Sequence, residues 1–216
     1  MLAEYKTILN TAEAEFEEKK SRFIANVRPA TCEEEALEFI EAMRSKYWNA
    51  SHNVYAYSIN NGTLIQRYSD DGEPSGTAGV PALEVIKRMG LQDAVVVVTR
   101  YFGGTLLGAS GLIRAYSKSA SMGLEAAEIV TRKLCYNLNI IIEYTIFGRL
   151  QNMLISNNNI IKEIRYEQDV ELCVLIEVGN EEKLMKDIVE VSNGRAIQDL
   201  AEKTYITLGS DGRLII

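Results

Sequence analysis

The sequence predicts an α+β protein of two domains, and three observations carry this prediction. Its 216 residues, 47% hydrophobic and 25% charged, suffice for one large or two small domains, each with its own core. In the first part of the chain, segments that alternate with a period of two are mixed with segments of helical spacing. Near residues 133–137 the pattern restarts in the order strand, helix, strand, strand, helix, strand. We therefore expect a first domain at residues 1–134 and a ferredoxin-like βαββαβ domain at residues 135–216.

The first domain begins with strands and a helix. Alternation at residues 14–17 and the run at residues 22–27 predict two strands, with a turn or bulge at residues 18–21. The pattern Thr-Cys-Glu-Glu at residues 31–34 is typical of a capping box, so a helix should follow from about Glu33 to Tyr47.

The rest of the first domain should contain a hairpin, a buried strand and two helices. Strands at 53–59 and 64–68 are expected to pair across an Asn-Gly turn. A short helix should open at Pro81 and stop at Gly90. A buried valine-rich strand is expected at residues 94–98. A helix capped by Ser110 should follow at about residues 110–127.

In the second domain the same reasoning gives four strands and two helices. Asn180 is expected to cap the second helix, and the tail after Leu208 has a short apolar end without an assigned role. The predicted strands and helices are, in chain order, strand 138–144, helix 147–156, strands 160–166 and 170–178, a helix ending near 193–194, and strand 196–205.

Charge and composition restrict the class of protein. The net charge of −7 argues against a protein that coats nucleic acid without specificity. Residues 136–216 carry 8 basic and 13 acidic side chains, a net charge of −5, which disfavours independent nucleic-acid binding by that half. In contrast, residues 94–124 have no acidic side chain and contain Arg100, Arg114 and Lys118. The chain therefore has a locally basic segment within an acidic protein.

The cysteines and the N-terminus predict a cytoplasmic protein. The three cysteines are far apart and form no CxxC pair, which disfavours a disulfide framework or a zinc knuckle. The N-terminus lacks the pattern of a signal peptide, and the longest apolar runs are too short to span a bilayer. We expect no membrane partner.

Two glycine-rich segments, residues 69–81 and 99–116, are the strongest functional signal. Eight of the fifteen glycines lie between Ser69 and Gly111. Glycine permits backbone angles and close approaches that other residues forbid, at an entropic cost. A chain that concentrates glycine in this way is expected to shape a surface there.

Catalytic chemistry has little support in the sequence. His52 is the only histidine, which excludes multi-histidine metal sites, and we interpret it as a strand-start histidine that donates a hydrogen bond near the glycine turn. Asp70, Asp71 and Glu73 could bind a divalent cation or act as a general base, but turn formation is the favoured interpretation. They could also be the internal partners of Arg100 or Arg114, which would cancel the basic character. We expect no metal and no catalytic residue.

The second glycine segment offers a possible anion site. Gly103, Gly104 and Ser110 lie between the buried strand and the following helix, where backbone N–H groups often receive phosphate, although the P-loop spacing is absent. Arg114 and Lys118 are four apart on one face of that helix. They are either kept for an anionic partner or are ordinary solvated cations. Residues 101–102, Tyr-Phe, could stack on bases or simply pack against the core.

These motifs together resemble the IMPACT family, and the layout is similar to that of its bacterial YigZ/YvyE members. The resemblance is strong over about residues 1–130 and rests on layout beyond that point. The matching residues are 20–25, 52–57, 69–81, 100–104, 107–108, 111–112 and 114–116.

The resemblance implies a fold for each domain and a function connected with translation. It implies a ribosomal-protein-like α/β domain with a left-handed crossover, followed by a ferredoxin-like domain similar to the last domain of elongation factor G. Eukaryotic relatives restrain a translation-controlling stress kinase by means of an additional N-terminal domain that we do not find here. No catalytic residue set transfers, and we expect no cofactor.

We therefore expect a non-catalytic binding or regulatory protein associated with translation. Its partner would be RNA, the ribosome or a translation factor, contacted through the glycine-rich face. The alternative is a nucleotide- or phosphate-handling enzyme that uses the loop at residues 103–111. The residues expected to form the binding surface are His52, Asp70, Asp71, Glu73, Arg100, Gly103, Gly104, Ser110, Arg114 and Lys118.

Overall fold

The computed structural model describes residues 2–215 and divides into two compact units. The N-terminal unit holds residues 5–131 and 209–213, and the C-terminal unit holds residues 2–4, 132–208 and 214–215. Each unit has its own antiparallel sheet and helices, which confirms the α+β class and the two-domain architecture. No helix in the described part of the chain is long and apolar enough to cross a membrane.

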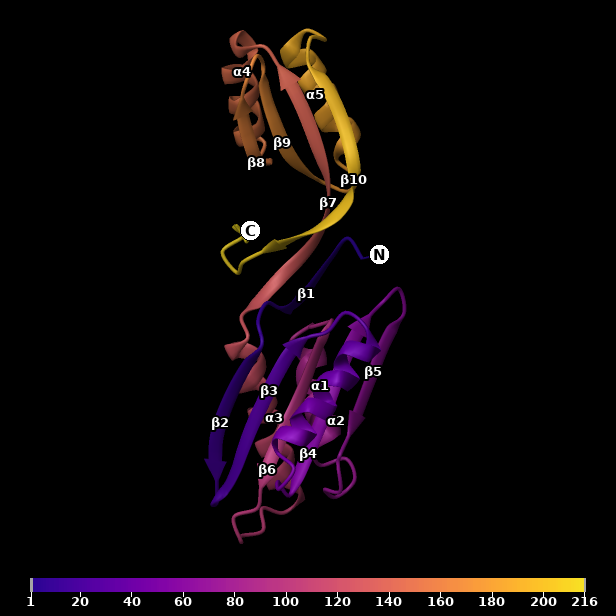
Figure 1. Ribbon diagram of the computed structural model, residues 1–216, viewed down its shortest axis with the longest axis vertical. Helices are drawn as coiled ribbons and strands as arrows, with labels where there is room; N and C mark the ends of the chain where they lie inside the picture. Colours follow the sequence, from indigo (N-terminus) through magenta and orange to yellow (C-terminus); the bar gives the residue numbers. More distant parts are fainter. Residues whose placement is uncertain (1, 216) are drawn as a thin grey trace. The chain divides into compact units, whose positions relative to one another are not determined.

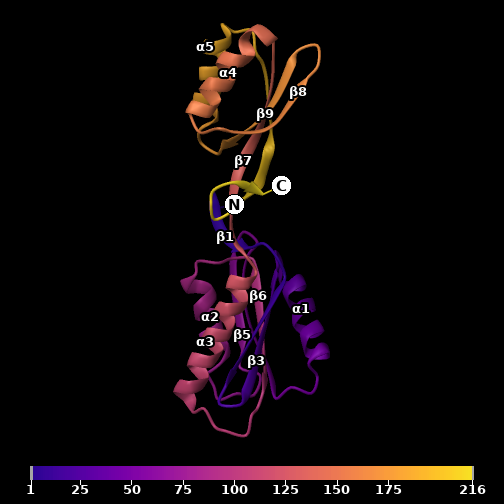
Figure 2. The ribbon, with the colours of Figure 1, turned by 90° about the vertical axis from the view of Figure 1, so that its left-hand side faces the viewer.

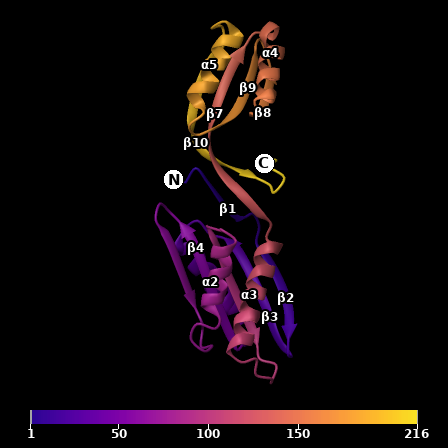
Figure 3. The same ribbon diagram turned by 180° about the vertical axis from the view of Figure 1, so that it is seen from behind.

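The N-terminal unit is a five-stranded sheet with helices on both faces. Its strand order is β2-β3-β6-β4-β5, and every neighbouring pair is antiparallel. Helix α1 covers one face, and α2 and α3 cover the other (Figures 2 and 3). The bounds are β1 Glu4–Ile8, β2 Ala12–Glu18, β3 Ser21–Pro29, α1 Glu33–Lys46, β4 His52–Asn60, β5 Leu64–Ser69, α2 Gly79–Arg88, β6 Ala94–Tyr101 and α3 Ala109–Ala126.

The central strand β6 explains the unbroken apolar run that predicted it. Val96 and Val98 pack in the core beneath α2 and α3, whereas Val95 and Val97 pack in the core beneath α1. Because helices cover both faces of β6, the side chains on both faces are buried, and the strand lacks the alternation of apolar and polar residues that a half-exposed strand has. The prediction of a buried strand is confirmed.

Four connections lie at one end of this sheet. The antiparallel register pairs His52 with Arg100, Arg22 with Tyr101 and Glu18 with Ser21, so the adjoining turns are neighbours. We call residues 19–20, 47–51, 70–78 and 102–108 together the loop end, which Figure 1 shows below the sheet. The N-termini of α2 and α3 are at the same end.

Two predicted helix starts and the predicted cap of a third helix need correction, whereas the start of α1 at Glu33 is confirmed. Helix α2 begins at Gly79, two residues before Pro81. Helix α3 begins at Ala109 with Gly108 in the N-cap position, so the prediction that Ser110 caps it is wrong. Gly108 has φ +74°, a left-handed backbone angle that glycine adopts without strain, and the helix starts directly after it. At α1 the backbone N–H of Thr31 donates to Glu35 and not to Glu34, one residue later than the sequence pattern suggests.

The C-terminal unit has the predicted βαββαβ order. Its sheet order is β10-β7-β9-β8, with β11 paired to β10, and α4 and α5 pack on one face around Leu150, Leu154, Leu184 and Ile188. Tyr144 opens α4, although the sequence placed it at the end of a strand, and the apolar tail forms β11. The bounds are β7 Ile129–Ile142, α4 Tyr144–Ser156, β8 Ile160–Tyr166, β9 Val170–Glu177, α5 Glu181–Ser192, β10 Ile197–Leu208 and β11 Leu214–Ile215.

Candidate functional site

A buried ion pair lies beneath the loop end. Arg100, at the end of β6, donates from Nη1 to Glu73 Oε1 over 2.6 Å, and the two residues are 5% and 8% exposed. The Tyr116 hydroxyl donates to the same oxygen over 2.7 Å. Burial, followed by the charge of Glu73, raises the pKa of Tyr116, so its hydroxyl remains a donor. Of the two roles that the sequence left open for Arg100, the structure shows internal pairing with the carboxylate loop.

Asp70 organises the first glycine segment. Its carboxylate accepts the backbone N–H groups of Gly76, Ala78 and Gly79 over 2.8–3.0 Å. Ala78 and Gly79 are the N-cap and first residue of α2, whose N–H groups have no partner within the helix, and Gly76 lies in the loop before them. Asp70 therefore caps α2 across the loop, a role that the sequence did not predict.

His52 and Asp71 connect this segment to β4. His52 Nδ1 lies 2.8 Å from the carbonyl oxygen of Asp71, so Nδ1 carries a proton and donates. In the neutral ring Nε2 is then an acceptor, and it lies 3.8 Å from Glu73 Oε1. The Asp71 carboxylate accepts the backbone N–H of Asn53. The predicted hydrogen-bond donation by His52 near the glycine turn is confirmed.

Gly103 has a structural role that no other residue could fill. An added Cβ would overlap the backbone of Lys20 and Ser21. Ser21 Oγ accepts both the Gly103 N–H and Arg100 Nη2, each over 3.2 Å. The loop after β6 is thereby fixed against the β2–β3 turn. Gly104 has φ +80° and open space around it.

A cavity of about 380 Å³ opens beside the N-terminus of α3, and we call it the α3 cavity. Its polar lining comes from His52, Glu73 and Arg100. The rest of the lining is mainly apolar or glycine, and comprises Gly72, Pro74, Phe102, Leu106, Leu107, Gly108, Ala109 and Leu112. The structure thus brings three of the predicted site residues into one cavity.

A second cavity, of about 300 Å³, contains exposed cations, and we call it the basic cavity. Lys19, Arg114 and Lys118 line it together with one carboxylate, Glu18. Arg114 donates only to the Ser110 carbonyl, and Lys118 Nζ lies 4.5 Å from the centre of the Phe16 ring. Within residues 2–215 neither Arg114 nor Lys118 forms an ion pair. Both are therefore available to an anion.

Sequence reasoning missed three residues of the loop end. Lys19 and Lys20 form the tip of the β2–β3 hairpin with φ +47° and +65°, a left-handed conformation that two-residue turns normally assign to Asn or Gly. Trp48, the only tryptophan, is 82% exposed. Two features of the sequence could have indicated these residues. They are the Lys-Lys pair between two predicted strands and a tryptophan that fits no apolar pattern.

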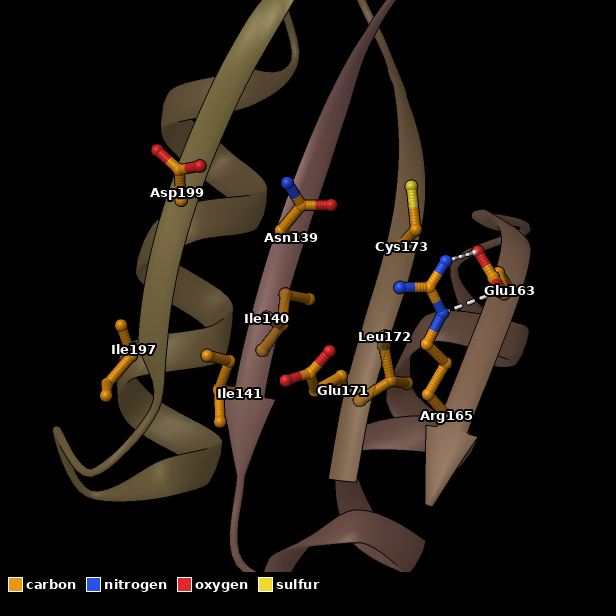
Figure 4. Close-up of a pocket in the computed structure, with 10 residues that line it drawn as sticks. All are labelled: Asn139, Ile140, Ile141, Glu163, Arg165, Glu171, Leu172, Cys173, Ile197 and Asp199. Atoms are coloured by element: carbon orange, nitrogen blue, oxygen red, sulfur yellow. Dashed lines mark hydrogen bonds and ion pairs between the residues drawn. The ribbon is translucent and has the colours of Figure 1, made fainter. Parts of the chain in front are cut away.

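The C-terminal unit has a cavity of a different character. A hollow of about 380 Å³ lies on the sheet face that α4 and α5 leave open (Figure 4). Its charged residues are Glu163, Arg165, Glu171 and Asp199, and Arg165 is already paired with Glu163 over 2.7 Å. The remaining charge is negative, so this hollow does not extend the basic surface.

The loop end can bind an anion more readily than it can hold a metal or act as a base. Among residues 2–215 no group of three metal-ligating His, Cys, Asp or Glu side chains is found. The carboxylates of Asp70 and Glu73 are engaged with backbone N–H groups, Arg100 and Tyr116. The exposed charges are cations, and the helix N-termini add positive potential.

Comparisons with known proteins follow the same division of the chain. The family model for the Impact N-terminal domain matches residues 19–124, and the model for a domain of unknown function, DUF1949, matches residues 140–195. The chain is 43% identical over 206 residues to the IMPACT family member YvyE of Bacillus subtilis, covering 95% of each protein. It is 34% identical over 96 residues to Protein IMPACT of Mus musculus, covering 42% of this chain and 30% of that protein. A solved structure described as that of a hypothetical protein aligns with a TM-score of 0.60 at 26% identity, over 94% of this chain and 98% of the other.

Proposed function

The chain belongs to the IMPACT family, and from this premise we propose that it is a non-catalytic RNA-binding protein that acts in translation. The loop end, together with the exposed face of α3, is the proposed contact surface. The observation that carries the proposal is the basic cavity, because Lys19, Arg114 and Lys118 line it and Lys20 adjoins it. Exposed lysine and arginine side chains are the groups with which proteins neutralise nucleic-acid phosphates.

Conformational strain at the hairpin tip supports this use of the cations. Lys19 and Lys20 both adopt left-handed backbone angles. A residue with a Cβ pays roughly 1 kcal/mol or more to do so. Asn-Gly would make the same turn without that cost. Retaining lysine at both positions is understandable if the ammonium groups bind a partner.

Exposed aromatic side chains at the same end favour single-stranded RNA. Trp48 is 82% exposed and Phe102 is 49% exposed. Unstacked bases bind to such rings, and each stacked base contributes roughly 1–3 kcal/mol. The bases of an intact duplex are not accessible to them in this way.

The link to translation comes from the family resemblance. The match to the Impact N-terminal domain spans residues 19–124 and so contains the loop end, and Protein IMPACT of Mus musculus is similar to 42% of this chain. The enzyme alternative has weaker support, because Glu73, the carboxylate that lines the α3 cavity, is already engaged with Arg100 and Tyr116.

Binding of a short single-stranded RNA of mixed sequence, measured by fluorescence anisotropy at low salt, tests the proposal. The variant combines Lys19→Ala, Lys20→Ala, Arg114→Ala and Lys118→Ala. A matched control removes four exposed cations of the C-terminal unit, namely Lys162, Lys183, Lys186 and Lys203. We expect the first variant to lose most of its RNA affinity and the control to retain it. Equal affinities of the two variants, or no RNA binding by the native protein, would contradict the proposal.

A further inference from the structure

The sheet of the C-terminal unit has one face that neither helix of that unit covers. Helices α4 and α5 pack on the other face, around Leu150 and Ile188. In the N-terminal unit, by contrast, helices cover both faces of the sheet. An antiparallel sheet can leave one face in water when that face is polar, so the composition of the open face decides whether it is suited to a partner.

The hollow of about 380 Å³ on this open face is lined by two rows of side chains (Figure 4). Each row crosses β10, β7, β9 and β8 in turn, and the register of β7, β9 and β8 aligns its members. The rows are Asp199, Asn139, Cys173 and Glu163, and then Ile197, Ile141, Glu171 and Arg165. A partner that fills the hollow therefore meets side chains from all four strands.

Three apolar groups lie in the part of the hollow formed by β10, β7 and β9. Ile197 is 64% exposed, and Ile141 beside it is half-buried. Burial raises the pKa of the Cys173 thiol, so this side chain stays protonated and behaves as a small apolar group. A partner that covers these side chains removes apolar surface from water, which favours association.

The charge around these apolar groups is negative. Glu163 is paired with Arg165 over 2.7 Å, which leaves Glu171 and Asp199 as the free carboxylates of the hollow. Within residues 2–215 neither of these two forms an ion pair. They belong to β9 and β10, the two strands that flank Ile141 on β7 (Figure 4). An apolar side chain of a partner that packs on Ile141 would thus have a carboxylate on each side.

The charge of the open face distinguishes between possible occupants. RNA and an anionic lipid surface are negative, so the free carboxylates would repel both of them. A second copy of this chain that used the same face in a two-fold contact would place the free carboxylates against one another. A protein segment with lysine or arginine beside apolar residues complements both the charge and the apolar groups.

The shape of the open face favours a helix as that segment. The rows cross four strands, and four strands about 4.8 Å apart span about 14 Å, roughly the length of a ten-residue helix. An added strand, in contrast, would pair at the edge of the sheet and leave the hollow on its face unfilled.

We propose that the open face of the C-terminal sheet binds one amphipathic helix of a partner protein. The apolar stripe of that helix packs on Ile141, Cys173 and Ile197, and lysine or arginine side chains beside the stripe pair with the two free carboxylates. Apolar anchors at helical spacing are a common mode of peptide recognition. This binding is separate from the RNA contact of the loop end and goes beyond the proposed function.

Binding of a labelled synthetic peptide to the full chain, measured by fluorescence anisotropy, tests the proposal. The peptide has about 18 residues, with leucine at helical spacing and lysine elsewhere, and a second peptide carries glutamate in place of lysine. The charge variant is Glu171→Gln/Asp199→Asn. Its matched control is Glu182→Gln/Glu190→Gln, which removes two exposed carboxylates of α5 and changes the net charge equally. The apolar pair of variants is described next.

The apolar variant is Ile197→Gln, at a position exposed enough to leave the core of the unit unchanged. Its matched control is Val189→Gln, at a 48% exposed position of α5. We expect the lysine peptide to bind more tightly than the glutamate peptide. The charge variant and the apolar variant should each weaken its binding by about five- to tenfold, and both α5 controls should bind it as the native protein does.

Three outcomes would overturn the proposal. The first is a native protein that does not prefer the lysine peptide. The second is equal weakening by the open-face variants and the α5 controls, or no weakening by either open-face variant. The third is self-association of the native protein that Glu171→Gln/Asp199→Asn abolishes, since a second copy would then occupy the open face.

Discussion

Arg100 and Glu73 form a nearly solvent-free ion pair that joins the two glycine-rich segments of the chain. The distance between Nη1 and Oε1 is 2.6 Å, and the two side chains are 6% and 4% exposed. Arg100 belongs to β6, and Glu73 to the loop before α2. The pair therefore sets the position of one loop of the loop end relative to the other.

Removing one partner of this pair should cost far more stability than an exposed ion pair would. Glu73→Gln retains an acceptor for Tyr116 but leaves the Arg100 charge buried without a counterion. We expect a loss of about 3–5 kcal/mol in the free energy of unfolding, measured by urea titration. The double replacement Glu73→Leu/Arg100→Met should lose less than the sum of its single variants. Additive losses would show that the two charges do not interact.

Replacing the two lysines of the β2–β3 turn should raise the stability of the protein and weaken its RNA binding. Lys19→Asn/Lys20→Gly supplies residues that accept left-handed backbone angles without strain. We expect the variant to gain about 1 kcal/mol in unfolding free energy and to bind RNA more weakly than the native protein. Thermal unfolding and anisotropy on the same samples measure both effects. A variant that is more stable and binds equally well would remove the functional reason for the two lysines.

Gly103→Ala should disturb the same turn from the other side. Its Cβ would overlap the backbone carbonyl of Lys20, which cannot be relieved by rotating a side chain. We expect a clear loss of stability and weaker RNA binding. Gly148→Ala is the control, because nothing lies within 4 Å of the added Cβ in α4 and the change should stabilise by about 0.5–1 kcal/mol. A neutral Gly103→Ala would mean that the two loops are not in contact.

The cap of α1 predicts a pH-dependent difference in stability. Hydrogen bonding from the Thr31 backbone N–H, and then from its hydroxyl, lowers the pKa of Glu35 below the usual 4.5. A lowered pKa stabilises the folded state above pH 4.5, and this contribution disappears as the pH falls through the folded-state value. Glu35→Gln should therefore be less stable than the native protein at about pH 7, and the difference should be smaller at an acidic pH below 4.5. Urea midpoints at both pH values provide the measurement.

Local patterns predicted the elements well, because they depend on nearby residues. The run at residues 94–98, the Asn-Gly hairpin and the βαββαβ order all follow from spacing along a short stretch, and the structure confirms them. The start of α3 was predicted one residue late because the left-handed Gly108, and not a side-chain cap at Ser110, precedes it.

The contacts between distant residues at and beside the loop end could not be predicted in the same way. Arg100 meets Glu73 across 27 residues because of strand register, and the sequence could only leave that pairing open. Lys19 lies beside Arg114 and Lys118 because β2 packs under α3, a contact between segments about 95 residues apart. Trp48 is exposed although tryptophan is usually buried, and no local sequence pattern distinguishes an exposed tryptophan from a buried one.

The salt dependence of RNA binding tests the central claim most directly, since it counts the phosphates that the protein neutralises. For single-stranded RNA the slope of log K against log salt is about −0.7 per phosphate contact. The native protein should give a clearly negative slope, and the variant lacking Lys19, Lys20, Arg114 and Lys118 should be shallower by about 2 to 3 units, while the four-cation control of the C-terminal unit keeps the native slope. Equal slopes for the native protein and the variant lacking Lys19, Lys20, Arg114 and Lys118 would contradict RNA binding through these cations.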